Sequence, residues 1–259
     1  MQTTTHPFRR LAATAAFVIS TAGAATQAAP IIDAGWDFLF TEPGTSFAGV
    51  PFTGVPIASF DFGPPYGPLP VGGADTIVHR LAPASVPTSP GTAPPVPIEL
   101  AALSMVSAAP TDLGAGVGYY YMGLQKDRGG PASIGQMTIT FDTDNTGTFD
   151  SFFDVFFDIR FGSANGPIVY SSDLVLSSSG SYWQRNPPPG GVVIDGLDHL
   201  LNGVDTSHDF WPVNANGGGG GAIIETHPTG AQHVVGSPTP GTAGVLGLGG
   251  LLVCRRRRS

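Results

Sequence analysis

Hydrophobic and polar residues alternate with a period of two along much of this chain, most regularly over residues 149–161. Because successive side chains of a β-strand point to opposite faces, this run predicts a strand with one face on a hydrophobic core. Its core face consists of Phe149, Phe153, Val155, Phe157, Ile159 and Phe161, interrupted by Ser151. The preceding run, 137–143, predicts a partner strand joined by an acidic, glycine-containing loop. We take this pair as the centre of the fold.

Shorter runs of the same kind predict further strands, at residues 31–40, 60–62, 76–81, 98–106, 114–124, 168–176, 222–226 and 232–235. The run 98–106 places Ile98, Leu100, Ala102 and Val106 on one side, although its Ala and Leu residues leave a helix open. The serine-rich segment 177–181 predicts a turn. The best helix candidate is 195–201, which is barely two turns long.

Turn-forming residues separate these runs, because the chain holds 37 Gly and 25 Pro among 259 residues. Residues 82–97 form the longest such segment and predict an extended loop of polyproline character. Many short alternating runs between Gly and Pro turns are typical of two packed sheets. The sequence therefore predicts an all-β sandwich, jelly-roll-like, with long Gly/Pro-rich loops and at most one short helix.

Both ends of the chain have the character of addressing segments. Residues 1–28 begin with His6, Arg9 and Arg10, continue with a small apolar run, and predict a signal peptide cleaved after Ala28. An uncleaved membrane anchor is the alternative. Residues 29–236 are then the folded body, and residues 237–259 are a separate tail.

The net charge of −8 understates how acidic the body is. Six of the 11 basic residues lie in the end segments, whereas all 19 acidic residues lie between them, so the part between carries −14. Such a surface repels nucleic acid and anionic lipid, and it keeps an exported protein soluble. The single cysteine, Cys254, lies in the tail, so no intramolecular disulfide can form.

An acidic loop between the two central strands is a candidate calcium site. Asp142, Asp144, Thr146 and Asp150 occupy positions 1, 3, 5 and 9 of a calcium-type loop, and Gly147 occupies position 6. Calcium prefers several oxygen ligands around a tight turn. Phe153 stands where an EF-hand has a bidentate Glu, and strands flank the loop. An acidic hairpin, in which Asp and Asn serve the turn, is therefore the alternative.

Other clusters of polar residues point away from catalysis. Asp150, Asp154 and Asp158 lie on one face at intervals of about 13 Å, which is too far apart for a glycosidase pair, and we expect a solvated face. His199, His208, His227 and His233 show no metal-ligand spacing. No compact catalytic motif occurs in the sequence, and we expect a protein that is not an enzyme.

Two aromatic pairs are candidates for carbohydrate binding. They are Tyr182 with Trp183 and Phe210 with Trp211. Exposed aromatic rings stack against sugars, whereas buried ones anchor a core or a loop, and the sequence leaves both readings open.

The tail has three parts in a fixed order. Pro238, Thr239 and Pro240 come first, a 13-residue apolar run follows at 242–254, and Arg255, Arg256, Arg257 and Arg258 end it. This order resembles the PEP-CTERM sorting signal of bacterial exported proteins, with Thr239 in place of the usual Glu. The resemblance implies recognition by an exosortase in the inner membrane and removal of the tail. A plain C-terminal membrane anchor is the alternative.

These features predict an exported cell-surface or extracellular-matrix protein. Its expected partners are signal peptidase and exosortase during export and a surface polysaccharide afterwards, with membrane contact only through the tail before processing. The alternative is a secreted hydrolase whose site is assembled from distant residues.

Overall fold

The structure is a computed structural model that describes residues 29–186, 210–213, 222–226 and 232–236. The predicted signal peptide (1–28), the helix candidate (195–201) and the sorting tail (237–259) lie outside the described residues. His199, His208 and His227 lie outside them too.

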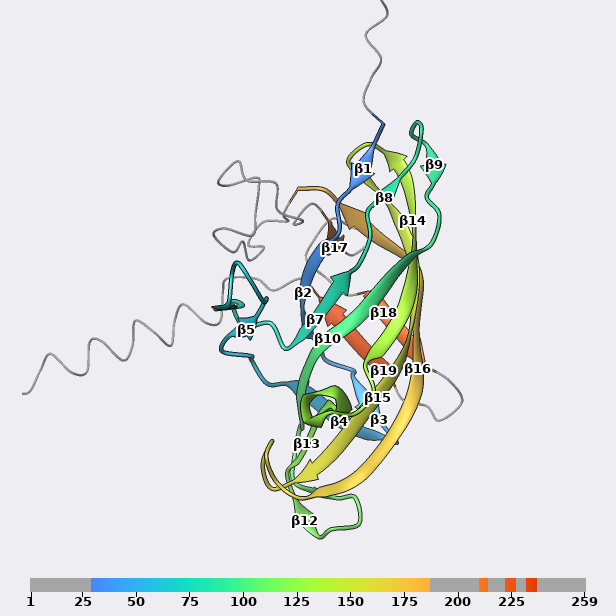
Figure 1. Cartoon of the computed structure of the whole chain (residues 1–259). Helices are drawn as coiled ribbons and strands as arrows, with labels where there is room; N and C mark the ends of the chain where they lie inside the picture. Colours follow the sequence, from blue (N-terminus) through green and yellow to red (C-terminus); the bar gives the residue numbers. More distant parts are fainter. Residues whose placement is uncertain (1–28, 187–209, 214–221, 227–231, 237–259) are drawn as a thin grey trace, which may run out of the picture.

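Strands make up nearly all of the regular structure (Figure 1). In chain order they are β1 (Ile31–Ile32), β2 (Gly35–Thr41), β3 (Ser46–Phe47), β4 (Val50–Gly54), β5 (Phe60–Asp61), β6 (Pro68–Leu69), β7 (Thr76–Arg80), β8 (Ala84–Ser85), β9 (Gly91–Thr92), β10 (Val96–Ser107), β11 (Thr111–Asp112), β12 (Val117–Gly118), β13 (Tyr120–Leu124), β14 (Ser133–Thr143), β15 (Thr146–Phe161), β16 (Ile168–Gln184), β17 (Trp211–Val213), β18 (Ala222–Thr226) and β19 (Gln232–Gly236). The one helix of the described part is the 3-10 helix η1 (Gln125–Arg128).

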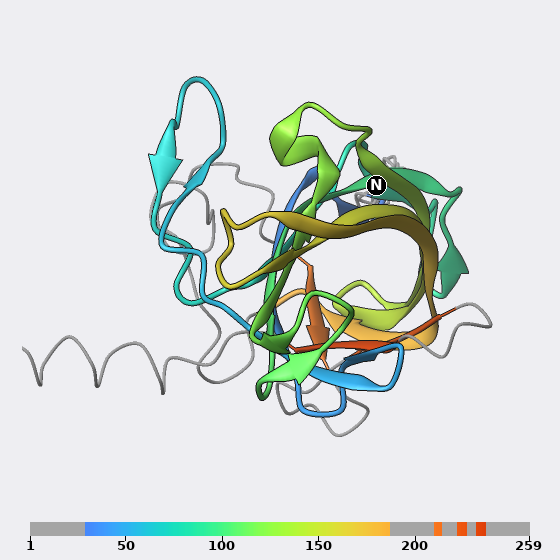
Figure 2. The ribbon, with the colours of Figure 1, turned by 90° about the horizontal axis from the view of Figure 1, so that it is seen from below.

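The predicted all-β sandwich is confirmed. Antiparallel pairings run from β2 through β7, β10, β13, β15, β16, β18 and β19 and back to β2. The two layers are therefore joined along both edges, and Figure 2 shows the long strands curling around one interior. Because the ladder returns to its first strand, few backbone donors and acceptors of these long strands are left unpaired at an edge.

The main core fills the space inside this circuit. The face predicted for residues 149–161 is confirmed, because Phe149, Phe153, Val155, Phe157 and Ile159 are all buried there. They pack against the inward residues of β2, β7 and β10, such as Leu39, Val78 and Ile98. Phe161, at the end of the strand, is only partly buried. Burial of these large side chains is the dominant stabilising contribution.

A second, smaller core lies on the outer face of β2, β7 and β10. The segment 55–75, which contains β5 and β6, folds over this face and buries Phe38, Phe62, Val71 and Ile77. β2 is therefore covered on both sides: Phe38 contributes to the outer core and Leu39 to the inner one. The prediction of a half-buried strand at 31–40 was wrong in this respect, since alternation within one strand does not show what covers its second face.

Strand β10 confirms that residues 98–106 form a strand, but the prediction of which of their side chains face the core was wrong in part. A β-bulge between Leu100 and Ala102 shifts the register against β7. Beyond the bulge, Leu103, Met105 and Ser107 are buried, whereas Ala102 and Val106 are only partly buried. One extra residue reverses which side chains point inward, so the predicted face of Ile98, Leu100, Ala102 and Val106 holds only up to Leu100.

The predicted turn at 177–181 was wrong, because these residues belong to the long strand β16. Their ladder with β15 shifts register between Phe149 and Ser151, and Gly180 adopts a φ of 63° there. The serines occupy an irregular stretch of strand, where glycine supplies the left-handed backbone that other residues rarely adopt.

Candidate binding groove

The acidic loop is a β-hairpin in which Asp144 and Asn145 connect β14 to β15. The Thr143 and Thr146 hydroxyls lie 2.8 Å apart, and the Asn145 backbone N–H donates to Thr143 Oγ1. Arg185 holds the turn from outside by donating to the Asp144 carbonyl oxygen at 3.1 Å and 3.2 Å. These contacts are the side-chain chemistry of a turn.

The strand register separates Asp150 from that turn. Asp150 faces Thr138 across the ladder and lies four residues beyond Thr146, about 13 Å along the strand. Its carboxylate accepts hydrogen bonds from Ser179 Oγ at 2.9 Å and the Gly180 N–H at 2.7 Å. The structure thus places Asp142, Asp144 and Thr146 at the hairpin end and Asp150 beside the irregular part of β16.

Gly147 has a packing role in this hairpin. A Cβ there would lie 1.9 Å from the Thr140 carbonyl oxygen and 2.8 Å from Trp183 Nε1. Trp183 donates to that same carbonyl at 3.1 Å, so the indole crosses the strand where only glycine fits. Close approach of the indole explains the glycine without a metal.

In the part of the chain that the structure describes, no group of three or more His, Cys, Asp or Glu residues could hold a metal ion. Calcium binding by the loop stays a prediction. Thermal melts with calcium and with chelator test it. Calcium binding predicts that calcium raises the melting temperature of the native protein but not that of Asp144→Ala.

Three of the four candidate sugar-binding aromatics are buried. Trp183, Phe210 and Trp211 are at most 2% exposed, and Trp183 stacks on Phe210 with ring centroids 5.7 Å apart. Of the two readings that the sequence left open for these three residues, their burial supports the anchoring of the core. Tyr182 is 45% exposed, because it precedes Trp183 and points to the opposite face of β16.

The predicted solvated face of β15 was wrong for Asp158. Asp150 and Asp154 are exposed, but Asp158 is 1% exposed. Arg128 donates to its carboxylate through Nε and through Nη2 at 2.9 Å, and Ser171 donates at 2.6 Å. These bonds lower the pKa of the Asp158 carboxyl, the Arg128 bond most, against the opposing effect of burial. The helix η1, which was not predicted from the sequence, places Arg128 over β15.

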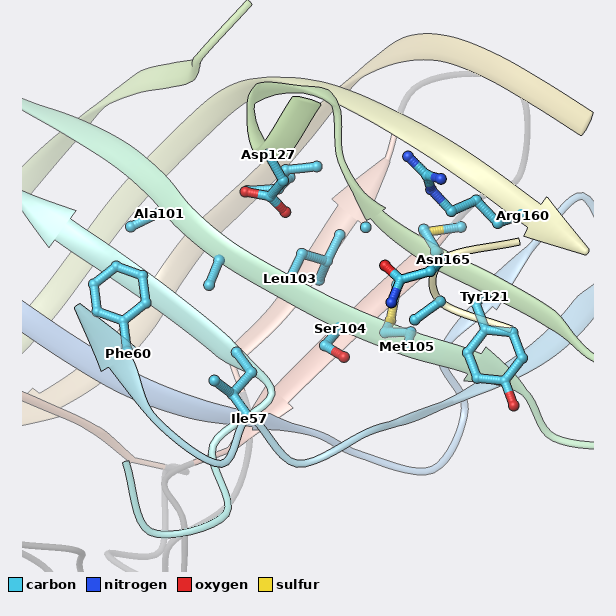
Figure 3. Close-up of a pocket in the computed structure, with 15 residues that line it drawn as sticks. Ile57, Phe60, Ala101, Leu103, Ser104, Met105, Tyr121, Asp127, Arg160 and Asn165 are labelled. Atoms are coloured by element: carbon cyan, nitrogen blue, oxygen red, sulfur yellow. The ribbon is translucent and has the colours of Figure 1, made fainter. Parts of the chain in front are cut away.

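A groove of about 380 Å³ lies on the outer face of β10 and β13 (Figure 3). Its floor is built from small residues, namely Ala101 and Ala102 of the bulge, Ser104, and Gly123 opposite Ser104. The bulge produces this floor because it turns two consecutive alanines toward the outer side, and bulges are frequent beside binding sites.

Aromatic and polar side chains form the walls of the groove. Phe60 comes from the segment 55–75, and Tyr121 comes from β13, and Figure 3 shows them on opposite sides of the pocket. Asp127 of η1, Arg160 of β15 and Asn165 of the following loop supply charged and amide groups. Phe60 is held by edge contacts to Trp36 at 5.3 Å and Phe62 at 5.1 Å, so this wall is fixed before a ligand arrives.

Most of the basic side chains of the body lie around this groove. The body has only five basic residues, and Lys126, Arg128 and Arg160 are three of them. Lys126 Nζ lies 2.8 Å from Glu99 Oε1, and Arg160 Nη1 donates to the Gly166 carbonyl at 3.1 Å. Arg160 Nη2 also lies 3.9 Å from Asp158 Oδ2.

Asp127 is the one carboxylic acid among the described residues that line the groove. Asp127 is an exposed residue, but partial desolvation of its carboxyl raises the pKa above the ordinary value, against the attraction of Lys126 and Arg160. Nearby, His79 stacks on Trp36 with ring centroids 3.7 Å apart and an interplanar angle of 4°. Burial lowers the pKa of His79, which outweighs the effect of Glu99, so the imidazole is neutral near pH 7.

Sequence reasoning missed this groove. Its one local signal was the run Gln125–Arg128, where three consecutive charged residues occur in a chain that is only 12% charged. The groove also needs a bulge and a distant covering segment, and neither leaves a mark in the alternation.

None of the described helices is both long enough and apolar enough to span a membrane. Comparison with known proteins found no protein family, no curated relative and no solved structure that matches this chain.

Proposed function

We propose that this protein is an exported cell-surface or extracellular-matrix protein whose body binds polysaccharide in the groove between β5 and η1. The observation that carries the binding role is the set of side chains in that groove. Aromatic faces at Phe60 and Tyr121 accompany an acid, a guanidinium and an amide at Asp127, Arg160 and Asn165. Sugars need both kinds of contact, since their C–H faces pack on rings and their hydroxyls form hydrogen bonds.

The size of the groove supports this role. A volume of about 380 Å³ is within the range of about 300–1,000 Å³ that is usual for small-molecule sites. The groove is lined by β10, β13, β15, η1 and the segment 55–75, and all of these belong to the folded body. A rigid site of this kind costs little ordering entropy on binding.

Hydrolysis has less support. Glycosidases commonly use two carboxyl groups about 5–9.5 Å apart, and the described lining of the groove contributes Asp127 alone. The nearby Asp158 is buried under Arg128 and held as an ion by two basic residues. A raised pKa at Asp127 suits a general acid, but a partner base is required for turnover.

A binding screen with matched variants tests the proposed role. A Cβ on Gly123 would meet only the Leu103 carbonyl oxygen at 3.6 Å, so Gly123→Leu can extend into the groove without a backbone clash. Gln136→Leu, on an exposed position of β14, adds the same side chain elsewhere. We expect polysaccharide binding by native protein and by Gln136→Leu and at least a tenfold loss, about 1.4 kcal/mol, for Gly123→Leu. If both variants bind polysaccharide equally well, the groove is not the binding site.

Export is tested by mass spectrometry of the mature protein. The resemblance of the tail to a sorting signal supports a mature chain that begins at Ala29 and has lost the residues after Pro240. A mature protein that still carries Arg255 to Arg258 would refute processing and favour a simple anchor.

A further inference from the structure

We propose that the groove selects an uncharged sugar chain over uronic-acid, sulfated or amino-sugar polymers, an inference that rests on the proposed function. Charges are distributed differently at the groove and over the rest of the body.

The charges at the groove balance, unlike those of the rest of the body. Three basic groups, Lys126, Arg128 and Arg160, stand with three carboxyl groups, Glu99, Asp127 and Asp158. The body as a whole carries 14 more acidic than basic residues. Placing three of its five basic residues here makes this a locally neutral site on a strongly acidic protein.

Most of these charges are already committed to each other. Lys126 is paired with Glu99, and both Arg128 and Arg160 face the Asp158 carboxylate. An anionic sugar bound by Arg160 would compete with Asp158, a carboxylate only 2% exposed, and would leave Arg128 as its one remaining basic partner among these residues. Weakening the compensation of a buried carboxylate is unfavourable, so the arrangement disfavours anionic ligands.

Asp127 supplies acceptor oxygens for hydroxyl groups. No described side chain donates a hydrogen bond to its carboxylate, and the influences on its pKa are burial and the charges of Lys126 and Arg160. Those two cations also oppose the entry of an ammonium group, because like charges at close range are unfavourable. A neutral hydroxyl can donate to Asp127 without adding charge to the site.

The floor and walls suit a ring with apolar and polar faces. Ala102 and Gly123 leave the floor low, Phe60 and Tyr121 offer apolar surfaces, and Arg160 and Asn165 offer donors. Recognition then depends on packing and neutral hydrogen bonds, which salt screens weakly. Long-range steering by the acidic body does not help a neutral polymer and acts against an anionic one.

The experiment compares three probes on the mature exported protein: a neutral glucan, a polyuronate and a chitosan, each measured from about 0.05 to 0.5 M NaCl. We expect the neutral glucan to bind with a Kd that changes less than about twofold across this range. Gly123→Leu should abolish that binding and Gln136→Leu should keep it, with melting curves to confirm that both are folded.

A charge variant tests the selection directly. Asp127→Asn leaves one excess positive charge at the groove, so we expect polyuronate binding to appear or to rise at least about threefold at low salt. Tyr121→Ala, which leaves the charges unchanged, should weaken glucan binding without any gain for polyuronate. Suppose that native protein prefers one of the charged polymers, that its affinity falls steeply as the salt concentration rises, and that Gly123→Leu abolishes binding. The proposed selection of uncharged sugars is then wrong, but the proposed binding of polysaccharide in the groove stands. If no probe is sensitive to Gly123→Leu, both proposals fail.

Discussion

The two ends of the β2–β7 strand pair each bury a carboxyl group, but they satisfy it in different ways. At one end Asp37 forms an ion pair with Arg80, in which Arg80 Nε lies 3.0 Å from Asp37 Oδ2 and Arg80 Nη2 lies 3.2 Å from Asp37 Oδ1. At the other end Asp75 receives three neutral groups, the Thr41 N–H and hydroxyl and the Thr76 hydroxyl, at 2.8–3.0 Å. Asp37, Arg80 and Asp75 are all at most 3% exposed.

The ionic end depends on a partner of full charge. The Arg80 guanidinium also donates to the Asp33 carbonyl oxygen, and its Cζ lies 5.0 Å from the centre of the Phe210 ring. A buried ion pair adds little net stability relative to apolar residues, but each ion becomes costly once the other is removed. The arrangement therefore fixes which residues of β2 and β7 face each other.

The hydroxyl-bonded end depends on space and on protonation. Burial raises the pKa of the Asp75 carboxyl, and this effect exceeds the lowering by the hydrogen bonds from Thr41 and Thr76. Gly54 provides the space, since a Cβ there would lie 1.5 Å from Asp75 Oδ2. A carboxyl group can therefore be buried without a cation when two threonine hydroxyls and a backbone N–H surround it, and the stability of the fold then depends on pH.

The largest expected effect comes from breaking the ionic end. Asp37→Ala removes the Asp37 carboxylate from the buried Arg80 guanidinium, and we expect the free energy of unfolding to fall by about 3–5 kcal/mol. Denaturant melts at pH 7 measure this. Glu99→Ala, which removes the partner of a 24% exposed Lys126, is the control and should cost about 1 kcal/mol or less. Equal losses of unfolding free energy for the two variants would mean that burial does not determine how much an ion pair contributes to stability.

Filling the space at the hydroxyl-bonded end comes next. Gly54→Ala forces the Asp75 carboxylate out of its bonds, and we expect a loss of about 1–3 kcal/mol, as for other overpacked sites. Gly123→Ala is the matched control, because its new Cβ makes only an ordinary contact at 3.6 Å. The control should leave stability unchanged or raise it by up to about 1 kcal/mol through the unfolded chain. If Gly54→Ala leaves the free energy of unfolding unchanged, the Asp75 side chain can move to make room for the new Cβ.

The alternation of residues 149–161 predicted the central strand and its core face correctly, because period two follows from backbone geometry alone. It could not predict the facing of β10 beyond Leu100, since a bulge adds a residue without changing composition. The second core was also hidden. Phe60 and Phe62 were predicted as a strand, but nothing in their spacing shows that they cover Trp36 on another strand.

The charged contacts were harder still to foresee. Asp37 and Arg80 are 43 residues apart, and Arg128 and Asp158 are 30 apart, so their pairing follows from strand register and from η1. Spacing along one strand suggested that Asp158 was solvated like Asp154, and only the neighbouring element decides otherwise. The groove depends on the same non-local information, because its walls come from β5, β13, η1 and β15.

The smallest expected effect is a difference in how the stability contributed by Asp75 and by Asp158 depends on pH. The pKa of Asp75 is raised in the folded state, so the stability that it contributes is fully present below the unfolded value of 3.8 and is lost as pH rises through the folded pKa. Asp158 has the opposite sign, because its lowered pKa gives a contribution that is lost as pH falls below 3.8.

Asp75→Asn removes the titration and keeps the shape. At low pH the variant should be less stable than the native protein by about 1 kcal/mol, because an amide cannot replace every accepted hydrogen bond. This deficit should shrink as pH rises, since only the native protein then carries a buried charge at this end of the strand pair. Unfolding free energies of both proteins between about pH 3 and pH 7 measure the difference, and Asp158→Asn should show a deficit that grows over the same range. A deficit for Asp75→Asn that stays constant with pH would mean that the Asp75 carboxyl does not change its protonation on unfolding.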